Sequence, residues 1–503
     1  MHTFTVDASS AGVPFPHYWE LCVGSCHAPL GLREDWRRQL RQCHAELGFR
    51  YVRFHGLLCD DMSVCADNGN GVAYSFFNID SVFDFILSIG MRPFVELSFM
   101  PSVLASGTQT IFYYRGNVTP PRDYAAWGEL VRRLVQHWVE RYGRQEVQAW
   151  FFEVWNEPNL GGFWAGSQDE YFRLYRAAAE AIKAVDTELR VGGPASANNA
   201  WIPEMRAFCE DGGVPLDFIS THHYPTDAAP GWEADMAHIM GSVPRGVLKD
   251  MTVRARREAG HLPLYYTEWN CSAGNRTPQQ DESYSAAFVT KTIVDNQGLV
   301  DGYSFWTFSD IFEEGGMPSQ PFHGGFGLLA LHGVPKPAYR AFQLLHRAGD
   351  RRLPVGATAP YPYCLAEGDG LSGVSAAPHP TLEVLATRRD HSIQVLLYNH
   401  NVPLAPIAAE AVHVALSGLT GPAALQATVL RIDNDHANPK RRWQELGSPE
   451  YPNAAMVGEL LRASELRPET LTSHRDSNSS AARGAFDLTI PPHGVAALEI
   501  ELT

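Results

Sequence analysis

The sequence lacks several patterns that would assign it to a common class of protein. No stretch is apolar for long enough to cross a membrane, and the first residues lack the basic start and apolar run of a secretory signal. An excess of positive charge is also missing, because the formal net charge is −16 at pH 7. A surface with this charge repels a phosphate backbone. We therefore expect neither a membrane nor a nucleic acid as a partner.

The cysteines form no pattern that is typical of metal binding or of a disulfide scaffold. The eight residues, at positions 22, 26, 43, 59, 65, 209, 271 and 364, contain no CxxC pair and no zinc-type Cys/His spacing. Cys26-His27 and Cys43-His44 are adjacent pairs, but partly buried thiols are the simpler interpretation. Such cysteine usage is typical of a reducing compartment. We expect a cytoplasmic protein without a metal ion or an organic cofactor.

Apolar and aromatic residues, in contrast, are plentiful. Hydrophobic residues make up 45% of the chain and charged residues 19%, which is the composition of a globular protein. With 503 residues the chain exceeds one ordinary core, so a large domain and a smaller one are expected. The 12 Trp and 19 Tyr suit a neutral sugar substrate, because flat rings stack on sugar faces, although core packing explains most of them equally well.

Between about residues 20 and 345, short apolar runs alternate with helical patterns. Two of these patterns, residues 127–142 and 171–185, place their apolar side chains on one helical face, and Gly90 ends a third helix over residues 81–89. Strand and helix alternate eight times, which predicts a (β/α)₈ TIM barrel over residues 17–345. The eight expected strands are residues 21–24, 51–54, 93–97, 149–154, 190–193, 218–221, 264–267 and 303–306.

After residue 345 the pattern changes to short runs with a period of two, separated by Gly and Pro. The clearest runs are residues 381–386, 393–398, 412–416 and 495–500. This spacing predicts an antiparallel β-sandwich as an accessory domain over residues 346–503, interrupted by a short helix at 454–466. The N-terminal segment, residues 1–16, is a candidate edge strand of the same sandwich.

The ends of the predicted barrel strands are polar. Trp155-Asn156-Glu157-Pro158 closes the fourth run, where proline forbids continuation of the strand ladder, and Glu268 closes the seventh. Barrels of this type carry their chemistry at the C-terminal rim of the strands, so these residues are expected to converge on one pocket. The alternative is that each is an independent strand-end cap. Other polar residues at strand ends are His55, His222, His223, Tyr224, Thr307 and Asp310.

Two strand-end glutamates suit the hydrolysis of a glycosidic bond. One carboxylic acid protonates the departing oxygen, while the other, as a carboxylate, meets the anomeric carbon. Glu157 and Glu268 must then differ in pKa, and unequal burial together with mutual repulsion separates the two values. A double displacement requires the two carboxyl groups to face each other at about 5 Å.

The neighbouring residues have both a functional and a structural interpretation. Asn156 suits a hydrogen bond to a sugar hydroxyl, and His223 and Tyr224 suit contacts with the nucleophile or the sugar. Of the adjacent His222 and His223, one is expected to point into the core. Trp306 is a candidate sugar platform or a core residue. Glu313 and Glu314 reach sugar hydroxyls or form a solvated turn, and Glu96 and Glu153 are expected inside the barrel.

At these residues the chain resembles glycoside hydrolase family 39, and within it the β-xylosidases rather than the α-L-iduronidases. The matching pieces are residues 152–160, 221–225, 266–270 and 305–314 in the barrel, and residues 431–438, Trp443 and 447–449 in the accessory domain. The resemblance thus covers nearly the whole chain. The loops 59–70 and 107–118 lie outside the matching pieces, which leaves the aglycone preference open.

The resemblance implies retention of configuration through a covalent glycosyl-enzyme. Glu157 would be the acid/base and Glu268 the nucleophile, and no metal or cofactor would take part. The sugar subsite would be lined by His55, Asn156, His223, Tyr224, Trp306, Glu313 and Glu314.

We therefore expect an exo-acting retaining β-xylosidase that releases xylose from the non-reducing end of xylo-oligosaccharides. Alternatives are another pyranoside specificity in the same family (an α-L-arabinopyranoside, a β-galactoside or an iduronide), a transglycosylase, and a non-catalytic carbohydrate-binding barrel. A homo-oligomer is also left open.

Overall fold

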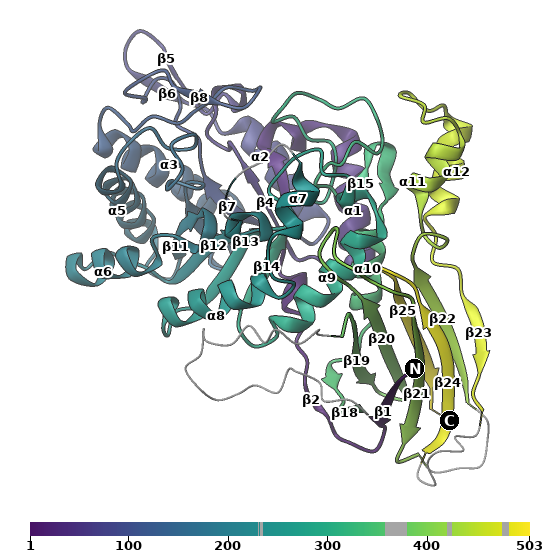
Figure 1. Ribbon diagram of the computed structural model, residues 1–503. Coiled ribbons are helices and arrows are strands. Elements are labelled where there is room, and N and C mark those ends of the chain that lie inside the picture. The colour runs from purple at the N-terminus through teal and green to yellow at the C-terminus, as the bar shows by residue number, and fades with distance from the viewer. Residues whose placement is uncertain (230, 232–234, 358–379, 420–424, 475–481, 503) are drawn as a thin grey trace.

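The computed structural model describes residues 1–229, 231, 235–357, 380–419, 425–474 and 482–502. These residues form a closed barrel of eight strands and, beside it, a four-stranded and a seven-stranded sheet. Figure 1 shows the barrel in purple to teal and the two larger sheets mostly in green to yellow, with the purple strands β1 and β2 added from the N-terminal end of the chain. The predicted TIM barrel with a β-sandwich accessory domain is confirmed.

All eight predicted strand runs lie in the barrel, and all of its pairings are parallel. In chain order the strands are β3 (Cys22–His27), β4 (Tyr51–His55), β7 (Arg92–Leu97), β10 (Phe151–Val154), β11 (Arg190–Ser196), β12 (Phe218–His223), β13 (Leu264–Trp269) and β14 (Gly302–Phe305). The helices that follow them are α1 (Glu34–Leu47), α2 (Phe77–Ser88), α3 (Tyr124–Tyr142), α5 (Gln168–Val185), α6 (Ile202–Gly212), α8 (Val247–Ala259), α9 (Ser283–Asp295) and α10 (Pro337–His346).

Several barrel strands extend further than the apolar pattern predicts, and in β12 and β13 the extension carries residues of the rim. β12 runs to His223 and β13 runs to Trp269, so Glu268 lies inside its strand rather than after it. Between these strands the register shifts after Thr221, so that His222 pairs with Glu268. Polar side chains at the rim remain in the ladder because the backbone still makes its hydrogen bonds there. The apolar pattern therefore underestimates the length of both strands.

Short elements surround the C-terminal rim of the barrel. The loop after β4 contains the hairpin β5 (Cys65–Asp67) and β6 (Val72–Tyr74), and the loop after β7 contains the hairpin β8 (Thr110–Ile111) and β9 (Gly116–Asn117). The remaining short elements of the barrel are α4 (Arg144–Val147), α7 (Met236–Gly241), β15 (Leu329–Ala330) and β16 (Val334–Pro335).

The sandwich packs two sheets around a core that includes Val395, Val414, Phe486 and Leu498. The four-stranded sheet has the order β18 (Val355–Ala357), β1 (His2–Asp7), β21 (Glu410–Ser417) and β24 (Ala482–Ile490). The seven-stranded sheet has the order β2 (Val13–Pro14), β17 (Arg351–Arg352), β19 (Leu382–Arg389), β20 (Ser392–Asn399), β25 (Val495–Glu501), β22 (Gln426–Ile432) and β23 (Glu469–Thr472).

Two details of the sandwich differ from the prediction. β1 lies inside its sheet, between β18 and β21, and pairs with β21 in parallel, whereas the sequence suggests an edge strand for the N-terminal segment; β2, from the same segment, lies at the edge of the other sheet. The helical insertion holds two helices, α11 (Pro439–Glu445) and α12 (Ala454–Ala463), of which only the second is predicted. Both pack on the barrel through an apolar cluster that contains Phe322, Trp443 and Leu460.

The seven cysteines in the described part of the chain are buried and unpaired, and Cys364 lies outside the described residues. None of the helices in the described residues has the length and apolar character that a membrane crossing requires.

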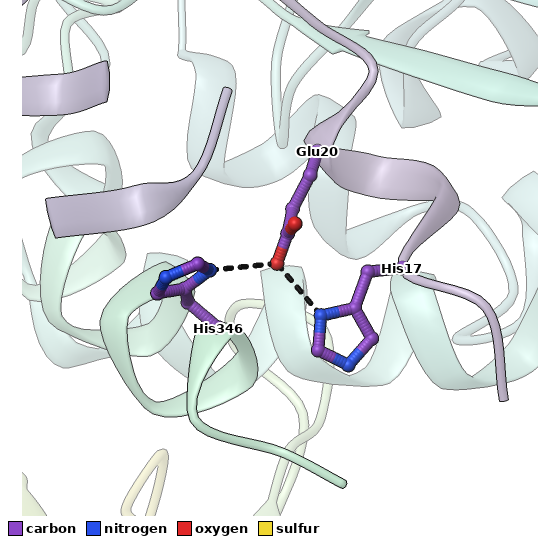
Figure 2. Close-up of side chains that lie close together, drawn as sticks. All are labelled: His17, Glu20 and His346. Carbon is purple, nitrogen blue, oxygen red and sulfur yellow. Dashed lines mark hydrogen bonds and ion pairs between the residues drawn. The ribbon is translucent and has the colours of Figure 1, made fainter. Parts of the chain in front are cut away.

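A polar bridge ties the first barrel strand to the last barrel helix. Figure 2 shows Glu20, which lies just before β3, between His17 and His346, the last residue of α10. One oxygen of Glu20, Oε1, contacts Nδ1 of His17 at 2.7 Å and Nδ1 of His346 at 2.8 Å. The two ends of the barrel segment are thereby held together on the side opposite the strand C-termini.

Glu383 in β19 pairs with two cations of the barrel. Its carboxylate is 2.9 Å from Arg245 and 3.2 Å from Lys291, and the three side chains are largely buried. We expect Glu383→Ala to lower the free energy of unfolding by about 3–5 kcal/mol, because it removes a buried anion that faces two buried cations. The matched control is Glu499→Ala, whose contact with Arg347 is exposed and contributes below about 1 kcal/mol. Equal losses in urea denaturation would contradict this interpretation.

Candidate active site

Glu157 is held at the rim by the turn that follows β10. Trp155 and Glu157 both have positive φ angles, 76° and 45°, so the chain turns sharply after Val154. The Trp155 side chain is fully buried and donates a hydrogen bond from its ring to the carbonyl of Phe163 at 2.8 Å. The amide of Glu157 donates to the carbonyl of Ala195 at 2.8 Å. These contacts direct the Glu157 carboxyl toward the mouth of the barrel.

Glu268 is held by a buried arginine on the second barrel strand. Arg53, with no exposed surface, donates from Nη1 to Glu268 Oε1 at 2.9 Å. The other oxygen of Glu268 accepts a hydrogen bond from the Tyr224 hydroxyl at 2.9 Å. Both contacts suit an ionised carboxylate. The same guanidinium also bonds Glu153 at 2.5 Å and Asn156 Oδ1 at 2.9 Å, so it connects strands β4, β10 and β13.

The two glutamates face each other. One carboxyl oxygen of each, together with a ring nitrogen of His222, lies within 4.8 Å of the others. This separation is near the about 5–5.5 Å of retaining glycosidases and well below the about 6.5–9.5 Å of inverting ones. The three atoms are also near enough to meet a cation, but Arg53 already places a positive charge on Glu268.

His222 links Glu157 to the interior of the barrel. The Thr267 hydroxyl donates to Glu153 Oε1 at 2.7 Å, so its oxygen accepts from His222 Nε2 at 3.1 Å. Burial, and then Arg53, hold the pKa of His222 well below its usual range, so the imidazole is neutral. With the ring proton on Nε2, Nδ1 presents a lone pair to Glu157 Oε1 at 2.9 Å, and the Glu157 carboxyl is the donor of this hydrogen bond.

The electrostatic surroundings favour the same protonation state. Burial, followed by the negative charges of Glu268 and Asp227, raises the pKa of Glu157 well above its usual range. Burial raises the pKa of Asp227 to about 7. Glu157 thus remains protonated near neutral pH while it faces an anionic neighbour, the combination that a general acid needs.

His55 and Trp306 form one wall of the site. His55 contacts Glu96 Oε2 through Nδ1 at 2.7 Å and lies 3.5 Å from Glu268 Oε1 through Nε2. Its ring centroid is 4.6 Å from that of Trp306. Gly24 makes room for the indole, because a Cβ at that position would lie 2.6 Å from Trp306. The two rings present an apolar surface beside the carboxylates.

A cavity of about 580 Å³ opens above the glutamates, within the about 300–1,000 Å³ range of small-molecule sites. Its residues come from loops after most of the barrel strands. They are His55, Phe112, Asn156, Glu157, Asn159, Leu160, Phe163, Ala197, Asn198, Ala200, Tyr224, Asp227, Glu268, Ala273, Trp306, Glu314 and Phe326.

The structure thus brings together seven of the nine predicted site residues: Glu157, Glu268, His55, Asn156, Tyr224, Trp306 and Glu314. Two lie elsewhere. His223 stacks on Tyr266, with ring centroids 3.7 Å apart, and points away from the carboxylates because its neighbour His222 occupies the inner face. Glu313 turns away from the cavity and contacts His27 Nδ1 at 2.5 Å. Alternation along the chain left open which histidine faces the core, and the structure directs His222, rather than the expected His223, toward the carboxyl groups.

Several residues of the site were missed at the level of sequence. Arg53 carries a usable signal, since a charged residue between Val52 and Phe54 in a buried strand requires buried partners. No such sequence signal marks Phe112, Phe163 and Asp227, because they reach the cavity from loops whose path depends on the whole barrel.

A (β/α)₈ barrel with paired glutamates at the ends of its fourth and seventh strands defines the class of barrel glycoside hydrolases. Comparison with known proteins identifies the family. The sequence model of the family described as glycosyl hydrolases family 39 matches residues 2–479, and the chain belongs to this family.

Two curated relatives are similar over nearly the whole chain. The chain is 51% identical to a β-xylosidase from Caldicellulosiruptor saccharolyticus, over 96% of this chain and 95% of that one. It is 36% identical to a β-xylosidase from Geobacillus stearothermophilus, over 97% and 93%. Among solved structures, a protein described as a monomeric β-xylosidase from Caulobacter crescentus superposes with a TM-score of 0.84 at 32% identity, covering 100% of both chains.

The interaction between the two glutamates can be measured directly. In Glu268→Gln the charge that helps to raise the Glu157 pKa is lost, while burial remains. We expect the Glu157 carboxyl to titrate at a lower pH than in the unmodified protein. The titration is measured by ¹³C NMR on protein with labelled glutamate. In Glu313→Gln, which removes a carboxylate that faces His27, the titration is expected to be unchanged. A Glu157 titration that does not move in Glu268→Gln would contradict the coupling.

Proposed function

We propose that this glycoside hydrolase is an exo-acting retaining β-xylosidase with Glu157 as acid/base and Glu268 as nucleophile. The observation that carries the proposal is the approach of the two carboxyl groups to within 4.8 Å in unlike surroundings. Glu157 faces a neutral imidazole, whereas Glu268 faces a guanidinium and a phenol.

In the first step Glu157 gives its proton to the departing glycosidic oxygen while Glu268 attacks the anomeric carbon. A covalent glycosyl-enzyme forms, and the aglycone leaves with the proton. In the second step Glu157, now a carboxylate, takes a proton from water, which attacks the same carbon and releases xylose. The negative charge of Glu268 is consumed in the first step, which lowers the Glu157 pKa for its role as a base.

The shape and charge of the cavity support a terminal, neutral sugar. Loops after β7, β10, β11, β12, β13 and β14 wall it, which suits the end of a chain rather than its middle. The described lining residues include the carboxyl groups of Asp227, Glu157, Glu268 and Glu314 but neither Arg nor Lys. A uronic acid would meet these carboxyl groups without a cationic partner, which disfavours the iduronide alternative.

The buried thiols support a reducing compartment, consistent with the cytoplasmic location that the sequence suggests. Association into a homo-oligomer stays a prediction.

Nucleophile replacement separates the two roles by stereochemistry. In Glu157→Ala, azide is expected to intercept the glycosyl-enzyme and give the β-xylosyl azide, because inversion occurs twice. In Glu268→Ala, azide is expected to attack directly and give the α-xylosyl azide, because inversion occurs once. The products from an aryl xyloside are identified by NMR. Identical azides from both variants, or near-normal turnover by Glu268→Ala without azide, would contradict the assignment.

The leaving group tests the acid separately. Glu157→Ala is expected to lose about 10²–10⁴-fold in kcat/KM on xylobiose, whose poor leaving group needs a proton. It is expected to lose much less on a nitrophenyl xyloside, whose leaving group departs unprotonated. Equal losses on the two substrates would mean that another residue supplies the proton.

The alkaline limb of the pH profile reports the Glu157 pKa in the free enzyme. Activity is lost as pH rises through that value, since the acid loses its proton. Asp227→Asn removes one of the negative charges that raise this pKa and retains an oxygen for the Tyr224 amide, 2.9 Å away. We therefore expect the limb of kcat/KM on xylobiose to move to lower pH. An alkaline limb that remains at the same pH, or that moves to higher pH, would contradict the electrostatic role of Asp227.

A further inference from the structure

A second group of side chains with unlike donor atoms lies close to the sugar cavity. His27 is the last residue of β3, and Cys59 and Asp61 belong to the loop after β4. One donor atom from each lies within 4.8 Å of the others, and Nε2 of His27 is 3.2 Å from Oδ2 of Asp61. An imidazole, a thiol and a carboxylate are the three ligand types that Zn²⁺ prefers.

The imidazole of His27 is oriented as in a metal site. Its side chain is 1% exposed, and its Nδ1 is 2.5 Å from the carboxylate of Glu313. This contact places the Nδ1 proton on the side of Glu313 and directs Nε2 toward Cys59 and Asp61. The Tyr114 ring stacks on the imidazole at 3.7 Å and fixes its plane. A carboxylate behind a metal-binding histidine is the usual outer partner of a zinc ligand.

The group also borders an empty space. A cavity of about 260 Å³ is lined by Cys59, Asp61, Tyr114, Asn117 and neighbouring residues. Tyr114 lines this cavity, and its hydroxyl is buried and has no hydrogen-bond partner among the described residues. Space for a water ligand therefore exists beside the three donors.

We propose that His27, Cys59 and Asp61 bind a divalent transition-metal ion, with Zn²⁺ as the expected occupant. Nε2, Sγ and one carboxylate oxygen supply three ligands, and a water in the cavity supplies the fourth. In the absence of metal, a proton on Nε2 of His27 faces the carboxylate of Asp61 at 3.2 Å. Binding releases this proton and that of the thiol. Spacing along the chain does not reveal the site, since His27 ends β3 whereas Cys59 and Asp61 lie in the loop after β4.

The bridge of Figure 2 has a similar composition but is less suited to a metal ion. There both histidines direct Nδ1 at the same oxygen of Glu20, so the ring N–H groups already have an acceptor. A metal on His17 Nδ1 would move the proton to Nε2, which is buried and without a partner among the described residues. An unpaired buried N–H is unfavourable, and His27 avoids it through Glu313.

Cobalt provides a direct test on the full-length protein. Added Co²⁺ is expected to give a thiolate-to-cobalt charge-transfer band with one equivalent bound, and Zn²⁺ is expected to displace it. Cys59→Ser is expected to abolish the band, while Cys65→Ser, another buried thiol in the neighbouring hairpin, is expected to leave it unchanged. A folded unmodified protein without the band, or a band that Cys65→Ser rather than Cys59→Ser removes, would overturn the proposal.

A matched pair of acidic residues gives a second readout that does not depend on the thiol. Asp61 is partly exposed and faces His27, whereas its neighbour Asp60 bonds the amide of Ser102 at 3.0 Å. Asp61→Asn is expected to weaken Zn²⁺ binding, measured by competition with a chelator. Loss of a residue that only hydrogen-bonds a metal ligand weakens binding about 10–100-fold, and loss of a ligand is expected to weaken it at least as much. Asp60→Asn is expected to retain the affinity. Equal affinities for the two variants would overturn the assignment of Asp61 as a ligand.

Discussion

The buried guanidinium of Arg53 is the interaction on which the site depends. It bonds Glu153, Glu268 and Asn156 and pairs with Glu96, all inside the barrel and away from water. The carboxylates around Arg53 offset the cost of removing its charge from water. The guanidinium in turn offsets the same cost for the carboxylates. This mutual requirement fixes the rotamer of Glu268, the proposed nucleophile, before any substrate arrives. A nucleophile held in one position before the reaction needs less reorganisation on the way to the transition state.

The asymmetry of the two glutamates follows from their positions in the same network. Glu268 receives hydrogen bonds from the cation and from Tyr224, whereas Glu157 faces the neutral His222, which the same cation helps to keep unprotonated. One buried positive charge therefore stabilises an anion on β13, whereas burial and the negative charges of Glu268 and Asp227 keep a proton on Glu157. The acid and the nucleophile acquire different chemistry although both are glutamates at strand ends.

The sequence predicted much of the fold and part of the site, for identifiable reasons. Apolar runs of a fixed length, separated by amphipathic helices, allow few arrangements other than a barrel, and the Trp155-Asn156-Glu157-Pro158 turn marks its rim. The histidine pair was assigned less well. A register shift after Thr221 places His222 beside Glu157, and His223 stacks on Tyr266 instead. Glu313 was likewise expected at the sugar, but His27 attracts it away from the cavity.

By itself the sequence determined which residue types stand at the strand ends, because periodicity and strand-breaking residues act locally. The tertiary structure decided which of these side chains share a cavity, which carboxyl group keeps its proton, and that His27, Cys59 and Asp61 meet. Those outcomes depend on distances between segments far apart in the chain and on the exclusion of water, and neither quantity exists until the barrel closes.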